Sequence, residues 1–218
     1  TLPPELQRTI GSVTWPDHHA LIDIIQSVQE GTLIGVSDGS ARIRDAKATH
    51  AWVIQAQNGS EIWGHGPVDG VTEARTIHRA ELQGQTAILL MLSLIVQLAG
   101  IIGGKIATFC DNQAVVKKMQ RGWSIWRYRN TKGADSDLQA QLRNVLAELK
   151  GAEFTYATEW VQGHQDEKGP AQSYPKQVAL NIRMDDETKT AYNLPGQWIT
   201  QQFIPVFKAE GCAVYIGG

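Results

Sequence analysis

The 218-residue sequence has few cysteines, little net charge and no long uninterrupted apolar run. Its two cysteines, Cys110 and Cys212, can form at most one disulfide and lie in no short metal-binding spacing, so a disulfide scaffold and a cysteine zinc site are both excluded. The formal net charge of −2 excludes a nucleic-acid or membrane partner held by overall charge alone. Any such partner would need a local patch.

The sequence also contains no signal for secretion or for membrane insertion. The longest apolar stretch, 87–102, contains Ser93, Gln97 and Gly100 and is shorter than the roughly 18–20 residues that cross a bilayer. The first ten residues lack the basic and apolar regions of a secretory signal. We therefore expect an intracellular protein of cytoplasm or nucleus, with no membrane partner.

The length and the 42% hydrophobic content fit one domain with appendages. We expect a lead-in segment over 1–31 with one short helix, a main domain over 32–194 and a C-terminal extension over 195–218. Because the chain starts at Thr1 and ends in two glycines, we expect a piece of a longer polypeptide, although a trimmed tag would leave the same ends.

Hydrophobic periodicity predicts an α/β domain. An antiparallel meander of three strands is followed by a long buried helix and then by alternating strands and helices. The predicted strands are 33–36, 51–54, 61–63, 105–111 and 154–161, and the predicted helices are 18–29, 76–99, 112–120, 137–150 (capped by Ser136) and 179–192. A short turn near Trp123 and an added strand at 212–216 complete the assignment. This order predicts a mixed five-stranded sheet with helices on both faces.

Three acids lie at or next to predicted strand ends, where the functional residues of an open α/β sheet are usually found. Asp38 ends the first predicted strand, Asp111 ends the fourth, and Glu81 lies in the first turns of the long apolar helix. Each has an ordinary alternative, since Asp38 could cap a turn, Asp111 could cap the next helix and Glu81 could be solvated. Carboxylates that cluster at the centre of a sheet need cations, and oxygen-only clusters favour Mg²⁺ or Mn²⁺.

Five motifs, in order and on matching elements, resemble those of the ribonuclease H family. They are SDGS at 37–40, RAEL at 79–82, CDNQAV at 110–115, WVQGHQD at 160–166 and NIRMD at 181–185. The resemblance is in particular to the ribonuclease H domains attached to retroelement reverse transcriptases, and it spans about residues 32–192. The resemblance implies a ribonuclease H-like fold and a catalytic domain over 32–194.

The resemblance also implies the catalytic residues. A quartet of Asp38, Glu81, Asp111 and Asp185 would hold two Mg²⁺ or Mn²⁺ ions, with Asp186 as the alternative to Asp185. His164 corresponds to a loop histidine that assists proton transfer or product release, although a structural or solvated histidine would fit the same place.

A slightly acidic protein that binds an anionic duplex needs a concentrated basic surface. The window 117–132 contains six basic residues, no acid and three aromatics. The resemblance implies that it grips a nucleic acid; the alternative is a solvated loop with tryptophans facing the core. The expected nucleic-acid-binding residues are Gly39, Ser40, Asn112, Lys117, Lys118, Arg121, Trp123, Trp126, Arg127 and Arg129.

These expectations combine into one function. The sequence resembles that of a metal-dependent endoribonuclease that hydrolyses the RNA strand of RNA/DNA hybrids, as part of a retroelement polyprotein whose reverse transcriptase is a further partner. As an isolated domain we expect a monomer. Two alternatives stay open: a DNA-directed nuclease of the same fold, and a catalytically inactive domain that binds nucleic acid or has a structural role.

Overall fold

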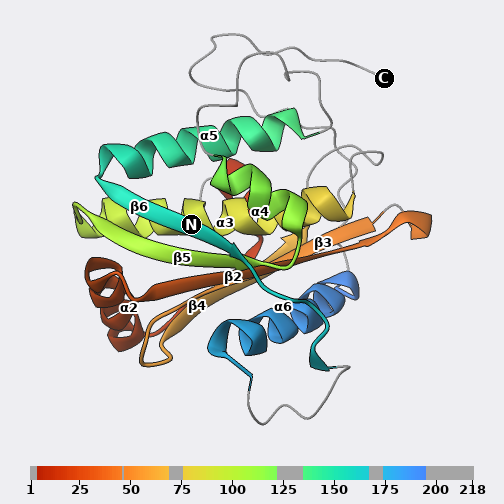
Figure 1. Ribbon diagram of the computed structural model, residues 1–218, viewed down its shortest axis with the longest axis horizontal. Coiled ribbons are helices and arrows are strands. Elements are labelled where there is room, and N and C mark those ends of the chain that lie inside the picture. Colours follow the sequence, from red (N-terminus) through yellow and green to blue (C-terminus); the bar gives the residue numbers. More distant parts are fainter. Residues whose placement is uncertain (1–3, 46, 69–75, 122–134, 167–173, 195–218) are drawn as a thin grey trace.

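The fold is described from a computed structural model, over residues 4–45, 47–68, 76–121, 135–166 and 174–194 (Figure 1). The elements, in chain order, are α1 (Pro4–Ile10), β1 (Ser12–Thr14), α2 (His18–Glu30), β2 (Leu33–Arg42), a 3₁₀ turn η1 (Ile43–Asp45), β3 (Lys47–Gln55), β4 (Glu61–Pro67), α3 (Ile77–Ala99), β5 (Gly104–Cys110), α4 (Gln113–Gln120), α5 (Ser136–Gly151), β6 (Phe154–Trp160) and α6 (Lys176–Tyr192).

The strands form one mixed sheet in the order β1-β4-β3-β2-β5-β6. β2, β3 and β4 make the predicted antiparallel meander, whereas β5 is parallel to β2 and β6 is parallel to β5. The sheet therefore changes from antiparallel to parallel pairing at β2, its central strand. The predicted five strands are all present, but the count was wrong because β1 adds a sixth strand antiparallel to β4.

The segment before β2 has more structure than the single helix predicted there. α2 confirms that helix: Asp17 caps its first turn by accepting from the Ala20 amide at 2.8 Å, and Gly31 ends it with a left-handed φ of 68°. α1 and β1 were not predicted. The indole Nε1 of Trp52 on β3 donates to the Ile10 carbonyl at 2.7 Å, which ties α1 to the sheet. Residues 4–30 are thus packed onto the domain that follows.

The long helix α3 is the central helix of the protein. The Thr76 side chain accepts from the Arg79 amide at its start, and Gly100 ends it in the left-handed region. Its length and composition would suffice to span a membrane, but 78% of its most apolar stretch is buried inside the protein, as in a core helix. Ile77, the first residue of the helix, is 55% exposed.

Helices cover both faces of the sheet, as predicted. α3, α4 and α5 lie on one side and α6 lies on the other (Figure 1). The larger core joins α3 and α5 to the sheet and takes in Ile24 and Val28 of α2. A smaller core packs Leu180 and Met184 of α6 against Val36 and two residues of β3. The site described below lies where this second core borders the middle of β2, around Asp38.

Two details of helix capping differ from the predictions or refine them. Asn112, not Asp111, caps α4, because its Oδ1 accepts from the Ala114 and Val115 amides. Ser136, predicted to cap α5, is its first helical residue, and the Asp135 side chain before it makes no capping hydrogen bond. The predicted turn near Trp123, the strand at 212–216 and the extension 195–218 lie outside the described residues.

Candidate active site

Four carboxylates predicted from the sequence come from four different elements that meet beside the middle of β2. The prediction that Asp38 ends its strand was wrong, because pairing with β3 carries β2 on to Arg42. Asp38 lies on β2, Glu81 in the second turn of α3, Asp111 directly after β5 and Asp185 on α6. Asp38 and Glu81 are 6% and 2% exposed, and Asp111 and Asp185 are half-buried. The structure thus brings these four side chains into one electrostatically linked group, at the point where the sheet changes direction.

The alternation of side chains along β2 sends Asp38 toward α6. Val36 packs in the core beneath α6, so Asp38, two residues on, points to the same face. Gly39 faces α3 instead, where a Cβ would lie 2.4 Å from the Glu81 amide nitrogen. Only glycine permits this approach. Gly39, one of the expected nucleic-acid-binding residues, is buried and lets α3 approach β2.

Asp111 is held at the carboxyl end of β5 by main-chain contacts. The indole Nε1 of Trp160 donates to the Asp111 carbonyl at 2.8 Å, and the Val161 amide donates to the Cys110 carbonyl at 3.1 Å. Since Asn112 caps the following helix, the Asp111 carboxylate is not used as a cap. Gly163 passes beside that carboxylate.

The four acids affect one another's protonation. Burial, and then the charges of Asp111 and Asp185, raise the pKa of Asp38 well above its ordinary value. Burial, and then the charges of Asp38 and Asp111, do the same to the pKa of Glu81. Burial also raises the pKa of Asp111, although a hydrogen bond with Glu81 and the charge of His164 oppose this. The group therefore resists carrying four negative charges unless cations are present.

Cys110 is a member of this group that sequence reasoning did not assign to the site. Its thiol is buried and donates to Glu81 Oε2 over 3.5 Å. Burial, followed by the charge of Glu81, raises the pKa of the thiol well above its usual value. One ligand atom each from Glu81, Cys110 and Asp111 lie within 4.8 Å of one another. Its position directly before Asp111 was the available signal, but residue order alone does not give the direction of a side chain.

Asp185 and Asp186 differ sharply in their surroundings. The Asp185 side chain is 21% exposed and raises the pKa of Asp38, whereas the Asp186 side chain is 72% exposed. Lys189, which the sequence analysis did not single out, lies one turn on and pairs with Asp185 Oδ2 at 2.7 Å and with Asp186 Oδ1 at 3.3 Å. The half-buried position favours Asp185 over Asp186 as the fourth acid.

His164 lies in the segment after β6, on the side of Asp111. It is exposed and has a left-handed φ of 52°, which is uncommon for a residue other than glycine. Its charge is one of the influences that lower the pKa of Asp111, so the imidazole lies within electrostatic range of the acids without burial among them.

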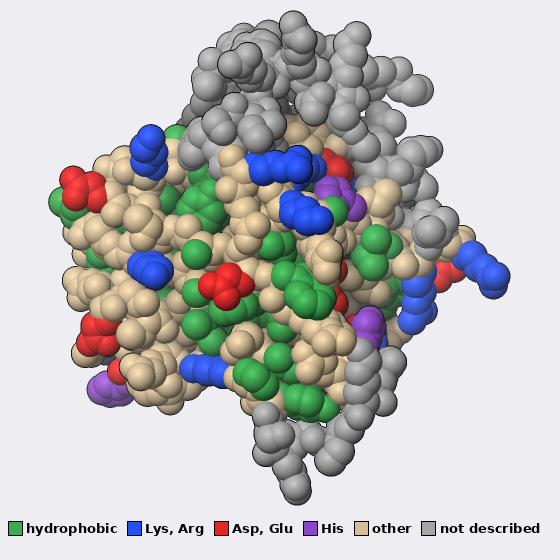
Figure 2. Space-filling view, viewed as in Figure 1, with side chains coloured by type: hydrophobic (Ala, Val, Ile, Leu, Met, Phe, Trp, Pro, Cys, Tyr) green, Lys and Arg blue, Asp and Glu red, His purple; other side chains and the backbone are tan. Residues whose placement is uncertain are grey.

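Six of the ten residues expected to bind nucleic acid lie in the described part of the chain. Asn112 caps α4, Ser40 is half-buried on β2, and Lys117 and Arg121 are exposed at the end of α4. Figure 2 shows Lys and Arg side chains on the surface over α4. The remaining members of the window, Trp123, Trp126, Arg127 and Arg129, lie outside the described residues.

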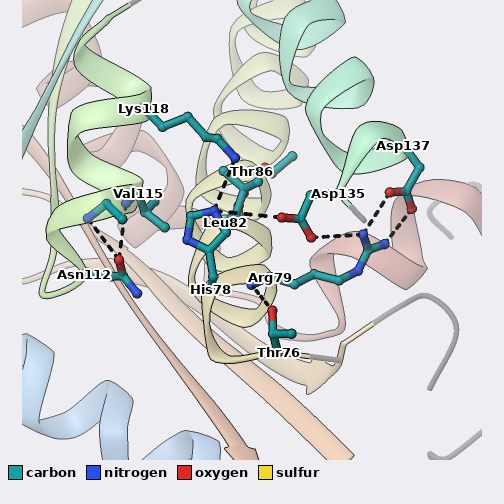
Figure 3. A network of polar contacts seen from close by, with 11 residues as sticks. Thr76, His78, Arg79, Leu82, Thr86, Asn112, Val115, Lys118, Asp135 and Asp137 are labelled. Atoms are coloured by element: carbon teal, nitrogen blue, oxygen red, sulfur yellow. Dashed lines mark hydrogen bonds and ion pairs between the residues drawn. The ribbon is translucent and has the colours of Figure 1, made fainter. Parts of the chain in front are cut away.

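A polar network next to the site fixes the first turn of α3 (Figure 3). Arg79 is 1% exposed and binds both carboxylate oxygens of Asp137 on α5, at 2.8 and 2.5 Å. Lys118 of α4 donates to His78 Nε2 at 3.2 Å, so this lysine is also engaged within the protein. Because Glu81 follows Arg79 by only two residues, these contacts also fix the part of α3 that carries Glu81.

The donor set fits divalent cations of the Mg²⁺ type. Carboxylate oxygens are the ligands such ions prefer, and two of the four acids are buried where an uncompensated charge is costly. Their mutual repulsion, seen in the raised pKa of Asp38 and Glu81, is what a dication would remove. The Cys110 sulfur is protonated by the same surroundings and adds no hard ligand.

No family model matches the chain, and no curated protein matches it. Solved structures do. Ribonuclease H1 of Halobacterium salinarum is 19% identical, over 73% of this chain and 96% of that one, with a TM-score of 0.46. LC11 ribonuclease H1 in complex with RNA/DNA hybrid is 15% identical, over 73% and 95%, with a TM-score of 0.49. The foamy viral protease-reverse transcriptase in complex with RNA/DNA hybrid is 11% identical, over 75% and 20%, with a TM-score of 0.49.

At these identities and TM-scores the matches assign no activity, ligand or residue role to this chain. The strand order and directions of the protein are those of a mixed α/β sheet with helices on both faces. The predicted α/β fold class is thus confirmed, with six strands in the described part of the chain.

Proposed function

We propose that the protein is a metal-dependent endoribonuclease that hydrolyses the RNA strand of RNA/DNA hybrids. The observation that supports it is the meeting of Asp38, Glu81, Asp111 and Asp185 from four elements, two of them buried and with raised pKa. Such an arrangement costs stability and is not explained by folding. The order of the sequence motifs around these acids supports the choice of substrate.

The chemistry follows from the donor set. Two Mg²⁺ or Mn²⁺ ions held by the quartet would supply an activated water and neutralise the departing oxygen in displacement at phosphorus. The Cys110 thiol donates a hydrogen bond to the Glu81 carboxylate, and the Trp160 indole donates one to the Asp111 main-chain carbonyl. These contacts hold the carboxylates in place before substrate arrives, so little reorganisation is needed.

His164 and the end of α4 would serve the substrate around this centre. The exposed imidazole, within electrostatic range of Asp111, is suited to proton transfer or product release. Lys117 and Arg121 lie further along the chain than Asn112, at the end of α4. Both side chains are exposed, as side chains that bind phosphate must be. We place the domain in a retroelement polyprotein, with its reverse transcriptase as a further partner, on the strength of the sequence resemblance.

Two other functions are compatible with this fold. A DNA-directed nuclease would use the same acids on a different duplex, and an inactive domain would bind nucleic acid without cutting it. The second is disfavoured because buried Asp38 and Glu81 are costly to keep where no chemistry requires them.

Cleavage of three labelled substrates tests the proposal. RNA/DNA hybrid, duplex RNA and duplex DNA are incubated with the protein in Mg²⁺, in Mn²⁺ and in chelator. We expect internal cuts in the RNA strand of the hybrid, and none in chelator. Cutting of duplex DNA instead supports the DNA-directed alternative, and hybrid binding without cutting supports the inactive one. In the same assay, Asp186→Asn is the matched control for Asp185→Asn, because both variants remove one negative charge from α6.

A further inference from the structure

A buried amide joins the three elements that carry Asp38, Glu81 and Asp111. Gln85 lies on α3, one turn after Glu81, and is fully buried. Its Nε2 donates to Ser37 Oγ on β2 at 2.9 Å and to the Phe109 carbonyl on β5 at 2.9 Å. One side chain of the helix is therefore bonded to both strands.

The amide binds where the pairing of these two strands ends. β2 and β5 are paired from Leu33↔Ile106 to Val36↔Phe109, so their ladder ends just before Asp38 and Asp111. On their outer sides both strands stay paired further, β2 with β3 as far as Arg42 and β5 with β6 as far as Cys110. Gln85 bonds to the last paired residue of β5 and to the first residue of β2 beyond the ladder.

The packing of α3 brings the amide within reach. A Cβ at Gly84 would lie 2.8 Å from the Ser37 Cβ, and one at Gly35 would lie 2.9 Å from Ile88 on α3. Because these positions lack a Cβ, the helix lies as close to β2 as its backbone allows. A side chain of glutamine length then spans from α3 to both strands.

We propose that Gln85 is a positioning residue of the metal site, which sets the separation of Asp38 and Asp111 by bonding to their strands where the ladder ends. The inference rests on the proposed function for its consequence, which is metal affinity. Gln85 touches neither metal nor substrate. It acts through the strand backbones. Its bond to Ser37 positions the next residue, Asp38, and its bond to Phe109 positions Asp111, two residues further along the chain.

The chain offers a matched control for the loss of a buried amide. Gln83 lies on the same helix, is also fully buried, and its Nε2 also donates to main-chain carbonyls, those of Arg8 at 3.2 Å and Pro67 at 3.3 Å. These carbonyls belong to α1 and β4, which carry none of the four acids. A purely structural role for Gln85 predicts that both glutamines behave alike.

The test compares Gln85→Met, Gln83→Met and Ser37→Ala with the wild-type protein. Mn²⁺ affinity is measured by calorimetry, thermal unfolding is followed in parallel, and crystal structures give the distance between the Cγ atoms of Asp38 and Asp111. We expect Gln85→Met to weaken Mn²⁺ binding about tenfold, Ser37→Ala to weaken it less, and Gln83→Met to leave it unchanged, although both methionine variants lower the melting temperature. If Gln85→Met does not fold, Ser37→Ala decides by the same comparison.

Equal Mn²⁺ affinities in Gln85→Met and Gln83→Met would overturn the inference. A wild-type protein that binds no Mn²⁺ would contradict the proposed function, and the crystal structures then decide the role of Gln85 alone. A changed Cγ–Cγ distance in Gln85→Met, unchanged in Gln83→Met, supports the positioning role, and an unchanged distance in both refutes it.

Discussion

Gly163 lies against the carboxylate of Asp111, such that a Cβ at residue 163 would be 2.3 Å from Asp111 Oδ2. The nearest atom is the end of a side chain that can rotate away. We therefore expect Gly163→Ala to fold with nearly unchanged stability while displacing Asp111, and to lower hybrid cleavage at least about tenfold. Melting temperature and initial rates measured together check this. A variant of full activity would show that Asp111 does not need its present orientation.

The two neighbouring acids of α6 give a matched pair of variants. Both Asp185→Asn and Asp186→Asn remove one charge and one contact with Lys189. Because Asp185 is half-buried beside Asp38 and Asp186 is 72% exposed, Asp185→Asn should lower cleavage roughly 100-fold, whereas Asp186→Asn should change it little. Initial rates of hybrid cleavage measure both. The reverse order would make Asp186 the fourth acid.

The charge cluster should cost stability near pH 7. Burial and neighbouring charges raise the pKa of Asp38, so the folded state binds protons more tightly than the unfolded state, and stability is lost as pH rises through the folded pKa. Asp38→Asn should therefore melt about 2–4 °C higher for each kcal/mol gained, and Mg²⁺ should raise the melting temperature of the wild type but not of the variant. A lower melting temperature for Asp38→Asn without metal would argue against this account.

His50 should give the opposite pH dependence. Complete burial lowers its pKa to about 4 from an ordinary 6.5. The unfolded state therefore binds a proton that the folded state does not, and stability falls as pH falls from 6.5 toward 4, by about 2 kcal/mol at pH 5. Urea unfolding of the wild type and of His50→Leu at pH 7.5 and pH 5 isolates this contribution, since the acids affect both proteins alike. Parallel pH profiles would contradict it.

The sequence allowed much of the site to be predicted, because the motif order and the end of β5 locate acids without side-chain detail, although Asp38 lies within β2 and not at its end. Asp38, Glu81 and Asp111 were expected together on that ground and lie together. Periodicity indicates which face of α3 is buried but not which buried amide spans two strands, so Gln85 was missed. β1 has only three residues, too few for a period-two pattern to be recognised.

Glycines were the hardest residues to interpret from sequence. Gly39 was expected to bind nucleic acid, yet its missing Cβ lets α3 approach β2. Gly163 was not singled out, although it lies against the Asp111 carboxylate. A glycine indicates that something approaches the backbone closely, but only the packed structure identifies the neighbour.

The central claim is that the four carboxylates perform hydrolysis of the RNA strand, and Asp111→Asn tests it most directly. This change keeps the shape of the side chain and removes one charge. Hybrid cleavage in Mg²⁺ and hybrid affinity in Ca²⁺ are measured for the wild type and the variant. We predict that cleavage falls by a factor on the order of 100 or more while affinity is retained. Undiminished cleavage by Asp111→Asn would contradict the account.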